Sequence, residues 1–423
     1  MKIKDQKLSN GLRFISAPLP GTRTATVLVI YKTGSKYENR KTSGLSHFVE
    51  HMMFKSTDRR PNASVIASEL DSIGGEYNAF TSKEFTGYYI KADCAKFNRA
   101  LDIISDMVLN SKFDNEEINK ERGVIIEESN MYDANPMMKI EDIFEQVLYG
   151  DTPAGWDTIG FKENIKNWKS EDFINYFKSQ YGTNSATLVF AGNLPKDAKK
   201  IAEKYFSPLP KNKWQNKLAV KEKQNAPQLL VVNKKIEQTV FSLGVRAYKS
   251  GSKEEAAVKL LGVILGGSMS SRLFSEVREK RGLAYSVRAT VEFYSDSGYL
   301  TAVAGVKNEK LEEALTAVLE EFRKIKEELV PAKEIKKSID LIAGRLAIQL
   351  EASDDVANWY GFQTILREKI VSPEEFLKKM RAVTANDLQK VAQQIFRPER
   401  LNLALIGPMK DQKKLSAILQ KFK

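Results

Sequence analysis

The stretch ATLVFAGNLPKDAKKIAEKYF, residues 186–206, has a counterpart near the other end of the chain in LNLALIGPMKDQKKLSAILQKF, residues 401–422. Each begins with an apolar run typical of a buried strand and continues into a helical pattern. Gly192 aligns with Gly407, and a Lys-Lys pair follows in both copies. An offset of about 215 residues is too long for a solenoid repeat, so we predict a duplicated α/β domain. Two unrelated α/β domains that end alike are the alternative.

The length and the middle of the chain support two domains. A chain of 423 residues fits two domains of about 200 residues each. Residues 207–227 are rich in Pro, Lys, Asn and Gln and show no periodicity. We therefore expect a linker at 211–226, between domains at 1–210 and 227–423.

The composition is that of a soluble protein, with 42% apolar and 28% charged residues. No stretch approaches the roughly 18 apolar residues of a membrane span, so we expect no membrane partner. The start, MKIKDQKLSNGL, has no apolar run after its lysines, and we expect no secretory signal. Cys94 is the only cysteine, which excludes an intrachain disulfide and a Cys-based zinc or iron–sulfur site. These features favour a cytoplasmic protein.

The net charge of +12 comes from 66 basic and 54 acidic residues. The lysines are scattered among acids, as in residues 307–329, and no RRM, zinc-finger or Gly-rich phosphate loop accompanies them. Dispersed charges on helices are typical of a solvated face. We therefore predict no nucleic-acid partner.

The segment SGLSHFVEHMMFKST, residues 43–57, has a helical pattern, with Ser43 or Ser46 available to cap its first turn. It contains the only two histidines of the chain, His47 and His51. A separation of four residues places both imidazoles on one helix face, within reach of one metal ion. Two surface histidines beside a helix glutamate are the alternative.

Glu50 lies between the two histidines in sequence and is rotated slightly off their stripe. That placement suits a general base acting on water held by the metal. Two neutral imidazoles and a carboxylate suit zinc, which keeps one position open in catalytic sites.

A third protein ligand has to be Asp or Glu, because the chain has no further histidine and only one cysteine. The helical stretch at 116–133 offers Glu121, Glu127 and Glu128. Glu121 and Glu128 are seven residues apart and share a helix face, so one could bind the metal while the other orients a histidine. The residues alone do not choose among the three.

Three segments together resemble the pitrilysin, insulysin and mitochondrial processing peptidase family of inverzincins, and its short two-domain bacterial members most of all: GLSHFVEHMMFKST, GGEYNAFTSKEFTGYY and ERGVIIEES. The resemblance covers essentially the whole chain. In that family a glutamate ligand follows the histidine helix by roughly 70–80 residues, and Glu128 is 77 residues beyond His51. The resemblance implies one zinc ion per chain, bound by His47, His51 and Glu128. It also implies that Glu50 is the base and that Glu121 supports the site.

The resemblance extends to residues outside the metal site. Arg278 and Tyr285 match a pair that holds the substrate carbonyl and stabilises its oxyanion, and a guanidinium and a phenol are suitable donors. A surface arginine and a core tyrosine are the alternative. Asn78 and Ala79, in GGEYNAFT, match the strand to which a peptide substrate adds as an extra β-strand. An ordinary internal strand is the alternative.

The resemblance implies an α+β fold of two homologous domains, each with a mixed, mainly antiparallel β-sheet flanked by helices. It implies a zinc-dependent endopeptidase that hydrolyses short or unfolded peptides inside a closed dimeric chamber. A homodimer is the expected assembly, and a heterodimer with a paralogue is the variant of it. The alternative function is a non-catalytic partner or scaffold subunit of a processing-peptidase-like complex.

Overall fold

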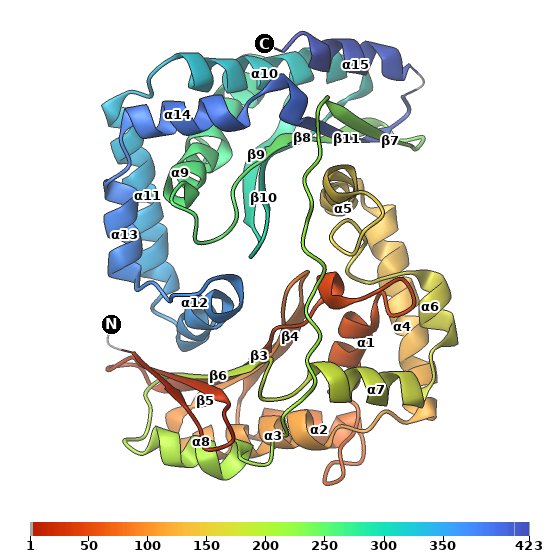
Figure 1. Ribbon diagram of the computed structural model, residues 1–423, viewed down its shortest axis with the longest axis vertical. Helices are drawn as coiled ribbons and strands as arrows, with labels where there is room; N and C mark the ends of the chain where they lie inside the picture. The colour runs from red at the N-terminus through yellow and green to blue at the C-terminus, as the bar shows by residue number, and fades with distance from the viewer. Residues whose placement is uncertain (1–2, 410, 423) are drawn as a thin grey trace. The chain divides into compact units, whose positions relative to one another are not determined.

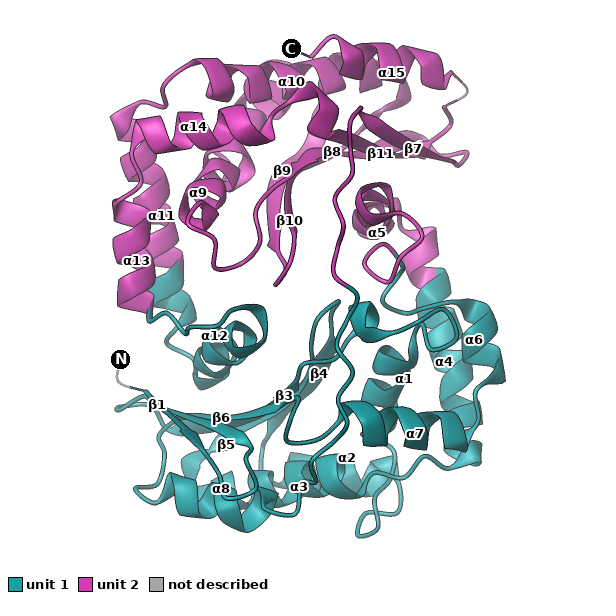
Figure 2. Cartoon of the chain, in the orientation of Figure 1, with its two compact units in different colours: residues 1–130, 156–218, 346–372 teal, residues 131–155, 219–345, 373–423 magenta. Residues whose placement is uncertain are grey.

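The computed structural model describes residues 3–409 and 411–422, which form two compact units, each built on one β-sheet (Figure 1). Figure 2 shows the segments that make up each unit. Unit 1 comprises residues 1–130, 156–218 and 346–372, and unit 2 comprises residues 131–155, 219–345 and 373–423. Helices flank both sheets, so the expected α+β class is confirmed. None of the helices in the described ranges is long and apolar enough to cross a membrane.

Unit 1 contains a six-stranded sheet with the order β1-β2-β6-β3-β5-β4. Its strands are β1 (Lys4–Lys7), β2 (Arg13–Pro18), β3 (Thr24–Tyr31), β4 (Glu76–Thr81), β5 (Thr86–Asp93) and β6 (Ala186–Gly192). Only β2 and β6 run parallel, and the other neighbours are antiparallel. The central strand β6 is buried along its whole length, as expected of a strand covered on both faces.

Helices cover both faces of this sheet, with α12 opposite α3 and α8 (Figure 1). Their bounds are α3 (Phe97–Asn110), α8 (Ala198–Phe206) and α12 (Ser353–Leu366). Alternate residues of β6 serve the two faces: the Phe190 ring lies 5.0 Å from the Phe97 ring of α3, whereas Val189 packs in the cluster of Tyr360 from α12.

Four further helices lie within unit 1. They are α1 (Leu45–Met52), α2 (Ala63–Ser72), α6 (Lys162–Asn167) and α7 (Ser170–Gln180). Two longer helices pass from one unit into the other: α4 (Asn115–Ala134) and α11 (Ala332–Gln349). Because α1 contacts β4 and β5, the sheet supports the helix that carries both histidines.

Unit 2 contains a five-stranded sheet with the order β7-β11-β8-β10-β9. Its strands are β7 (Gln228–Asn233), β8 (Gln238–Arg246), β9 (Ala284–Phe293), β10 (Gly298–Lys307) and β11 (Leu401–Gly407). Its helices are α5 (Pro136–Tyr149), α9 (Glu255–Gly266), α10 (Leu311–Glu327), α13 (Pro373–Arg381), α14 (Ala385–Ile395) and α15 (Gln412–Gln420). Helix α5 packs on β7, β8 and β11, and α10 packs on the opposite face (Figure 1). A π-helical turn at Phe274–Lys280 precedes β9.

The two sheets share one topology, as the repeated sequence predicts. In chain order, β2 to β6 correspond to β7 to β11, and each sheet pairs the first and last of these strands in parallel. The repeated strands β6 and β11 occupy equivalent positions, each between a parallel neighbour (β2 or β7) and an antiparallel one (β3 or β8).

The compact units differ from a division of the chain into two sequence halves, because each unit includes a helix from the other half (Figure 2). Helix α5 follows the first sheet in sequence but packs on the second, where the Phe144 ring lies 5.3 Å from the Tyr299 ring. Helix α12 packs on the first sheet, where the Ser353 hydroxyl lies 2.8 Å from the Thr26 hydroxyl. An apolar face predicts that a helix packs against another element, but it does not identify the sheet on which the helix packs.

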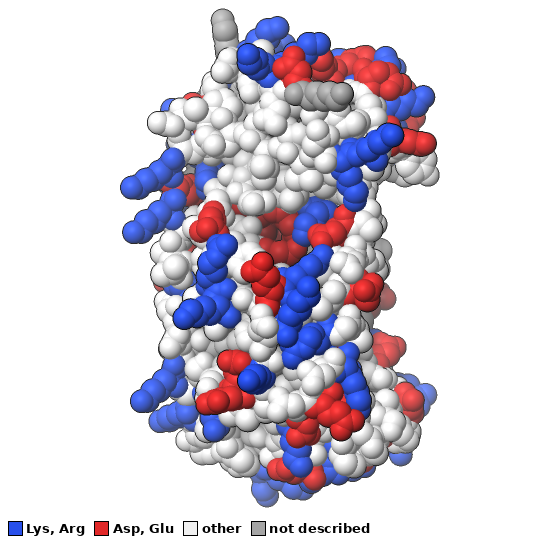
Figure 3. Space-filling view, turned by 90° about the vertical axis from the view of Figure 1, so that its right-hand side faces the viewer, with Lys and Arg blue, Asp and Glu red and all other residues white. Residues whose placement is uncertain are grey.

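Charged side chains are interspersed on the face of the molecule drawn in Figure 3. Lysines and arginines there lie beside aspartates and glutamates rather than in one basic patch. Ion pairs one helical turn apart in the described chain include Lys120 with Glu116 and Arg323 with Glu327. The absence of a nucleic-acid partner stays a prediction.

Candidate metal centre and active site

A buried carboxylate caps the N-terminus of α1. Glu38 accepts hydrogen bonds from the backbone N–H groups of Gly44, at 2.7 Å, and Ser46, at 2.6 Å. The expectation that Ser43 or Ser46 caps the helix is wrong: the N-cap position is Gly44, at φ 104°, which has no side chain, and the capping carboxylate comes from Glu38. A Cβ on Gly44 would lie 2.3 Å from the Ile159 carbonyl oxygen, so only glycine fits this close approach.

Donor atoms of His47, His51 and Glu128 converge between α1 and α4, all within 4.8 Å of one another. Glu128 Oε2 lies 3.6 Å from His47 Nε2 and 3.4 Å from His51 Nε2. Around a tetrahedral zinc ion with bonds of about 2.1 Å, neighbouring donors lie roughly 3.4 Å apart. These separations are too long for good hydrogen bonds and suit three ligands of one zinc ion. In the described ranges, no other group of three such side chains could hold a metal.

Glu121 holds the other ring nitrogen of His51. It lies on α4, seven residues before Glu128 and on the same face of that helix. Glu121 Oε1 lies 2.8 Å from His51 Nδ1, and Lys55 Nζ lies 2.5 Å from Glu121 Oε2. An ionised carboxylate only accepts hydrogen bonds, so Nδ1 donates and Nε2 is directed toward Glu128. Burial by itself raises the pKa of Glu121, but its bonds to His51 and Lys55 outweigh that effect and lower it.

The two histidines have opposite electrostatic environments. Burial, together with the charge of His51, lowers the pKa of His47 to about 4, which keeps this ring neutral and able to bind metal. Its Nδ1 is buried without a hydrogen-bond partner in the described structure. Burial also lowers the pKa of His51, but its contacts with Glu121 and Glu128 prevail and raise it to about 9. Contact with His51 in turn lowers the pKa of Glu128.

Glu50, on the same helix, contacts the sheet. Thr81 at the end of β4 donates a hydrogen bond from its hydroxyl to Glu50 Oε2 at 2.6 Å. Burial raises the pKa of Glu50, although the bond from Thr81 opposes that shift. A partly buried carboxylate with a raised pKa next to a candidate metal centre has the properties of a general base.

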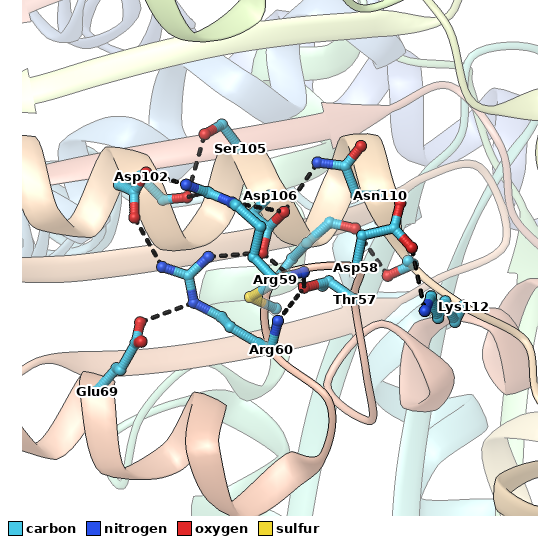
Figure 4. Close-up of polar contacts among 12 residues, drawn as sticks. Thr57, Asp58, Arg59, Arg60, Glu69, Asp102, Ser105, Asp106, Asn110 and Lys112 are labelled. Carbon is cyan, nitrogen blue, oxygen red and sulfur yellow. Dashed lines mark hydrogen bonds and ion pairs between the residues drawn. The ribbon is translucent and has the colours of Figure 1, made fainter.

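The segment that follows α1 is fastened by a buried cluster of charges (Figure 4). The Arg60 guanidinium donates to Glu69 on α2 at 2.7 Å, and to Asp102 at 2.7 Å and Asp106 at 2.5 Å on α3. Asp106 also accepts from the Thr57 hydroxyl at 2.6 Å. Because Arg60 and Asp106 are both buried, the cluster fixes the path of the chain from α1 to α2.

Asn78 and Ala79 lie in β4, which is an edge strand of its sheet. In the described ranges β4 pairs only with β5, so its outer edge carries no strand. Asn78 is exposed, and its side-chain oxygen accepts from the Ala79 N–H at 2.9 Å. An open strand edge of this kind is able to accept an extended peptide.

Arg278 and Tyr285 belong to unit 2 and lie against each other. The Arg278 guanidinium lies 5.1 Å from the Tyr285 ring centroid and 4.7 Å from that of Phe274. Tyr285 is 82% exposed, so it is not a core tyrosine. The structure therefore brings these two residues together, and their role toward a substrate stays a prediction.

Three residues of the site were not anticipated from the sequence: Glu38, Lys55 and Thr81. For Lys55 a signal was available, because it lies four residues after His51 in the segment predicted to be helical, although α1 itself ends at Met52. Glu38 and Thr81 reach α1 from a loop and from a strand, and spacing within the chain gives no indication of such contacts.

Two family models match this chain. Residues 13–160 match one described as insulinase (peptidase family M16), and residues 167–342 match one described as the peptidase M16 inactive domain. The chain is 33% identical to the uncharacterized zinc protease YmxG of Bacillus subtilis, with 96% of this chain and 98% of that protein covered. It is 34% identical to an uncharacterized zinc protease of Rickettsia felis, with 95% and 97% covered.

Solved structures give the same result for the fold. A protease from Helicobacter pylori matches with a TM-score of 0.89 at 25% identity, over 96% of this chain and 99% of that one. A peptidase M16 inactive domain from Pseudomonas fluorescens matches with a TM-score of 0.89 at 18% identity, over 97% and 98%. The latter supports the fold alone.

Proposed function

Because this chain belongs to the M16 peptidase family, as its motifs predict, we propose that it is a zinc-dependent endopeptidase. The observation that carries the proposal is the convergence of His47, His51 and Glu128 at the separations of a shared zinc ion. The neutral His47 and the support of His51 by Glu121 favour the same ligand set.

In the proposed reaction the side chains of unit 1 handle the proton. When bound, zinc acts as a Lewis acid that polarises the scissile carbonyl and acidifies a water molecule. Glu50 takes the proton of that water as it attacks the carbonyl carbon. Glu50 then delivers the proton to the leaving amine nitrogen as the C–N bond breaks, so the base is regenerated.

Substrate binding is assigned to two further elements. A peptide would extend the sheet at the free edge of β4, where Asn78 and Ala79 lie, through backbone hydrogen bonds that select little for side chains. Arg278 and Tyr285 would donate to the carbonyl oxygen as it becomes negative. Their mutual contact and the exposure of Tyr285 support this role.

We further propose a closed chamber formed by a homodimer, in which enclosure restricts substrates to short or unfolded peptides. A heterodimer with a paralogous chain is the variant of this assembly. We also propose a cytoplasmic location. Sedimentation of the purified chain, alone and with peptide, tests the assembly: a fully active monomer would contradict the chamber.

Metal analysis combined with hydrolysis of a fluorogenic peptide tests the function. The wild type should hold about one zinc ion per chain and cleave the peptide. Glu50→Gln should keep the metal and lose cleavage, because it removes only the base. Glu128→Gln should lose the metal, whereas Glu127→Gln, an exposed neighbour on the same helix, is the matched control and should keep both.

The rival function is that of a non-catalytic partner or scaffold subunit. The description of residues 167–342 as an inactive domain applies to the part of the chain without a metal cluster among the described residues. Wild-type protein that binds zinc but cleaves no peptide, alone or with added paralogue, would favour this rival and would overturn the proposed peptidase activity.

A further inference from the structure

Strand β4 holds Thr81 in a fixed register. The two faces of a strand alternate, so Phe80 and Thr81 point to opposite sides of the sheet. The Phe80 ring packs against Phe362 of α12, with centroids 5.4 Å apart. It also lies over Gly87 of β5, where a Cβ would come within 2.3 Å of Phe80 Cζ. Because the ring fills the space over this glycine, a slip of β4 by one residue would expel it.

On the opposite side of the sheet, β4 faces α1 and the segment after it. The Tyr77 ring lies 6.0 Å from the Phe54 ring, and the Thr81 hydroxyl lies 2.6 Å from Glu50 Oε2. Among the described residues, Thr81 provides the only hydrogen bond to the Glu50 carboxylate, and Oε1 receives none. Oε2 of Glu50 is therefore held by Thr81, while Oε1 is available to accept a proton.

We propose that Thr81 is a positioning residue for Glu50: its hydroxyl fixes one carboxylate oxygen and leaves the other to act on water in a single orientation. The inference rests on the proposed peptidase function. A glutamate has three rotatable bonds, and a base that samples several rotamers is correctly placed for only part of the time. Since β4 is also the strand whose edge would receive the peptide, one strand sets the register of both substrate and base.

Steady-state hydrolysis by zinc-loaded variants tests this role. Thr81→Val keeps the shape of the side chain and removes its hydroxyl, and we expect kcat to fall about 10- to 100-fold with KM changed less than about twofold. Thr81→Ser restores the hydroxyl and should recover kcat to within about threefold of the wild type. Thr86→Val, the matched control, removes a buried hydroxyl from the neighbouring strand that bonds to the Thr33 carbonyl, and should leave kcat unchanged.

Two further measurements separate positioning from a structural effect. In a Glu50→Gln background, Thr81→Val should cause no additional loss, because the base on which it acts is absent. Zinc content, and binding of a labelled peptide to the two Glu50→Gln proteins, should be equal with and without Thr81→Val.

The inference is overturned if Thr81→Val keeps kcat within about twofold of the wild type, or if it lowers zinc content or peptide binding. It is equally overturned if Thr86→Val shows the same loss of kcat. Should Thr81→Val not fold, Thr81→Ala is compared with Thr81→Ser by the same criteria. These results differ from a failure of the proposed function, in which the zinc-loaded wild type itself would not cleave.

Discussion

Zinc binding should displace a proton from His51. The contacts of His51 with Glu121 and Glu128 outweigh its burial and raise its pKa to about 9, so the ring of the metal-free protein carries a proton on both nitrogens at pH 7. A histidine must give up the proton on its coordinating nitrogen to bind metal. Glu121 holds the Nδ1 proton, so the proton released is that of Nε2. His47 contributes none, because burial lowers its pKa to about 4.

The size of the effect follows from that pKa. Well below pH 9, each unit by which the pH falls should weaken apparent zinc affinity about tenfold. Because half of the rings still carry the proton at pH 9, the affinity at pH 7 should be about 50-fold lower than at pH 9, or about 2.3 kcal/mol. Isothermal titration at pH 7 in buffers of different ionisation enthalpy should show about one proton released. The value rises toward one and a half if a metal-held water with a pKa near 7 also ionises. No proton release, with an affinity that is flat from pH 7 to 9, would refute this reasoning.

Removing the supporting carboxylate provides the control. Glu121→Gln should lower the pKa of His51, because the hydrogen bond that raises this pKa most is weakened when the carboxylate loses its charge. Proton release at pH 7 should then fall below that of the wild type, and the dependence of affinity on pH should flatten. Glu127→Gln, on the exposed side of α4, should behave as the wild type does. Equal proton release in Glu121→Gln would show that another group sets the charge of His51.

Three other predictions concern the elements around the site. Burial raises the pKa of Glu38 from 4.5 to about 7. Between these pH values the folded protein therefore binds more protons than the unfolded chain, and the free energy of unfolding should fall by up to about 3 kcal/mol as the pH rises from 4.5 to 7. In Glu38→Gln, the free energy of unfolding measured in urea should differ less between pH 5 and pH 8 than in the wild type. At both pH values it should be lower by about 1–3 kcal/mol, because the charged cap is lost. An unchanged dependence on pH would contradict this prediction. Asp106→Ala should lower unfolding free energy by about 3–5 kcal/mol, because it leaves a buried guanidinium short of a partner, and a loss below about 1 kcal/mol in the same assay would argue against a tight cluster. Gly87→Ala should lower the free energy of unfolding by about 1–3 kcal/mol, because the new Cβ displaces the Phe80 ring. Gly123→Ala is the control: a Cβ there meets nothing within 4 Å, so the substitution should be neutral or stabilising. Equal thermal stability of the two variants would show that β4 adapts freely.

Local geometry explains why much of the arrangement of the candidate metal site could be predicted. A spacing of four residues on a helix fixes the relative direction of two side chains, so His47 and His51 had to share a face once the segment was helical. The same holds for Glu121 and Glu128, seven residues apart on α4, which the structure places on either side of His51. Arg278 and Tyr285 were paired by resemblance to a family, and the structure brings them into contact from a π-helical turn and from β9.

The choice among the glutamates of α4 was different. Spacing left Glu121, Glu127 and Glu128 open, and only resemblance to a family favoured Glu128. The packing of α4 against α1 decides which carboxylates face the histidines, and it leaves Glu127 exposed. That packing depends on contacts between segments about 70 residues apart, which no local pattern encodes.

The sequence by itself determined the duplication, the strand and helix periodicities and the histidine pair, because each depends on repeats or spacings within one segment. Only the tertiary structure decided that α5 and α12 cover the sheet of the other half, that Glu38 rather than a serine caps α1, and that Thr81 contacts Glu50. Each of these joins distant segments through buried apolar area or a hydrogen bond. Such contacts are selected by the packing of the whole core, which the order of residues along one element does not specify.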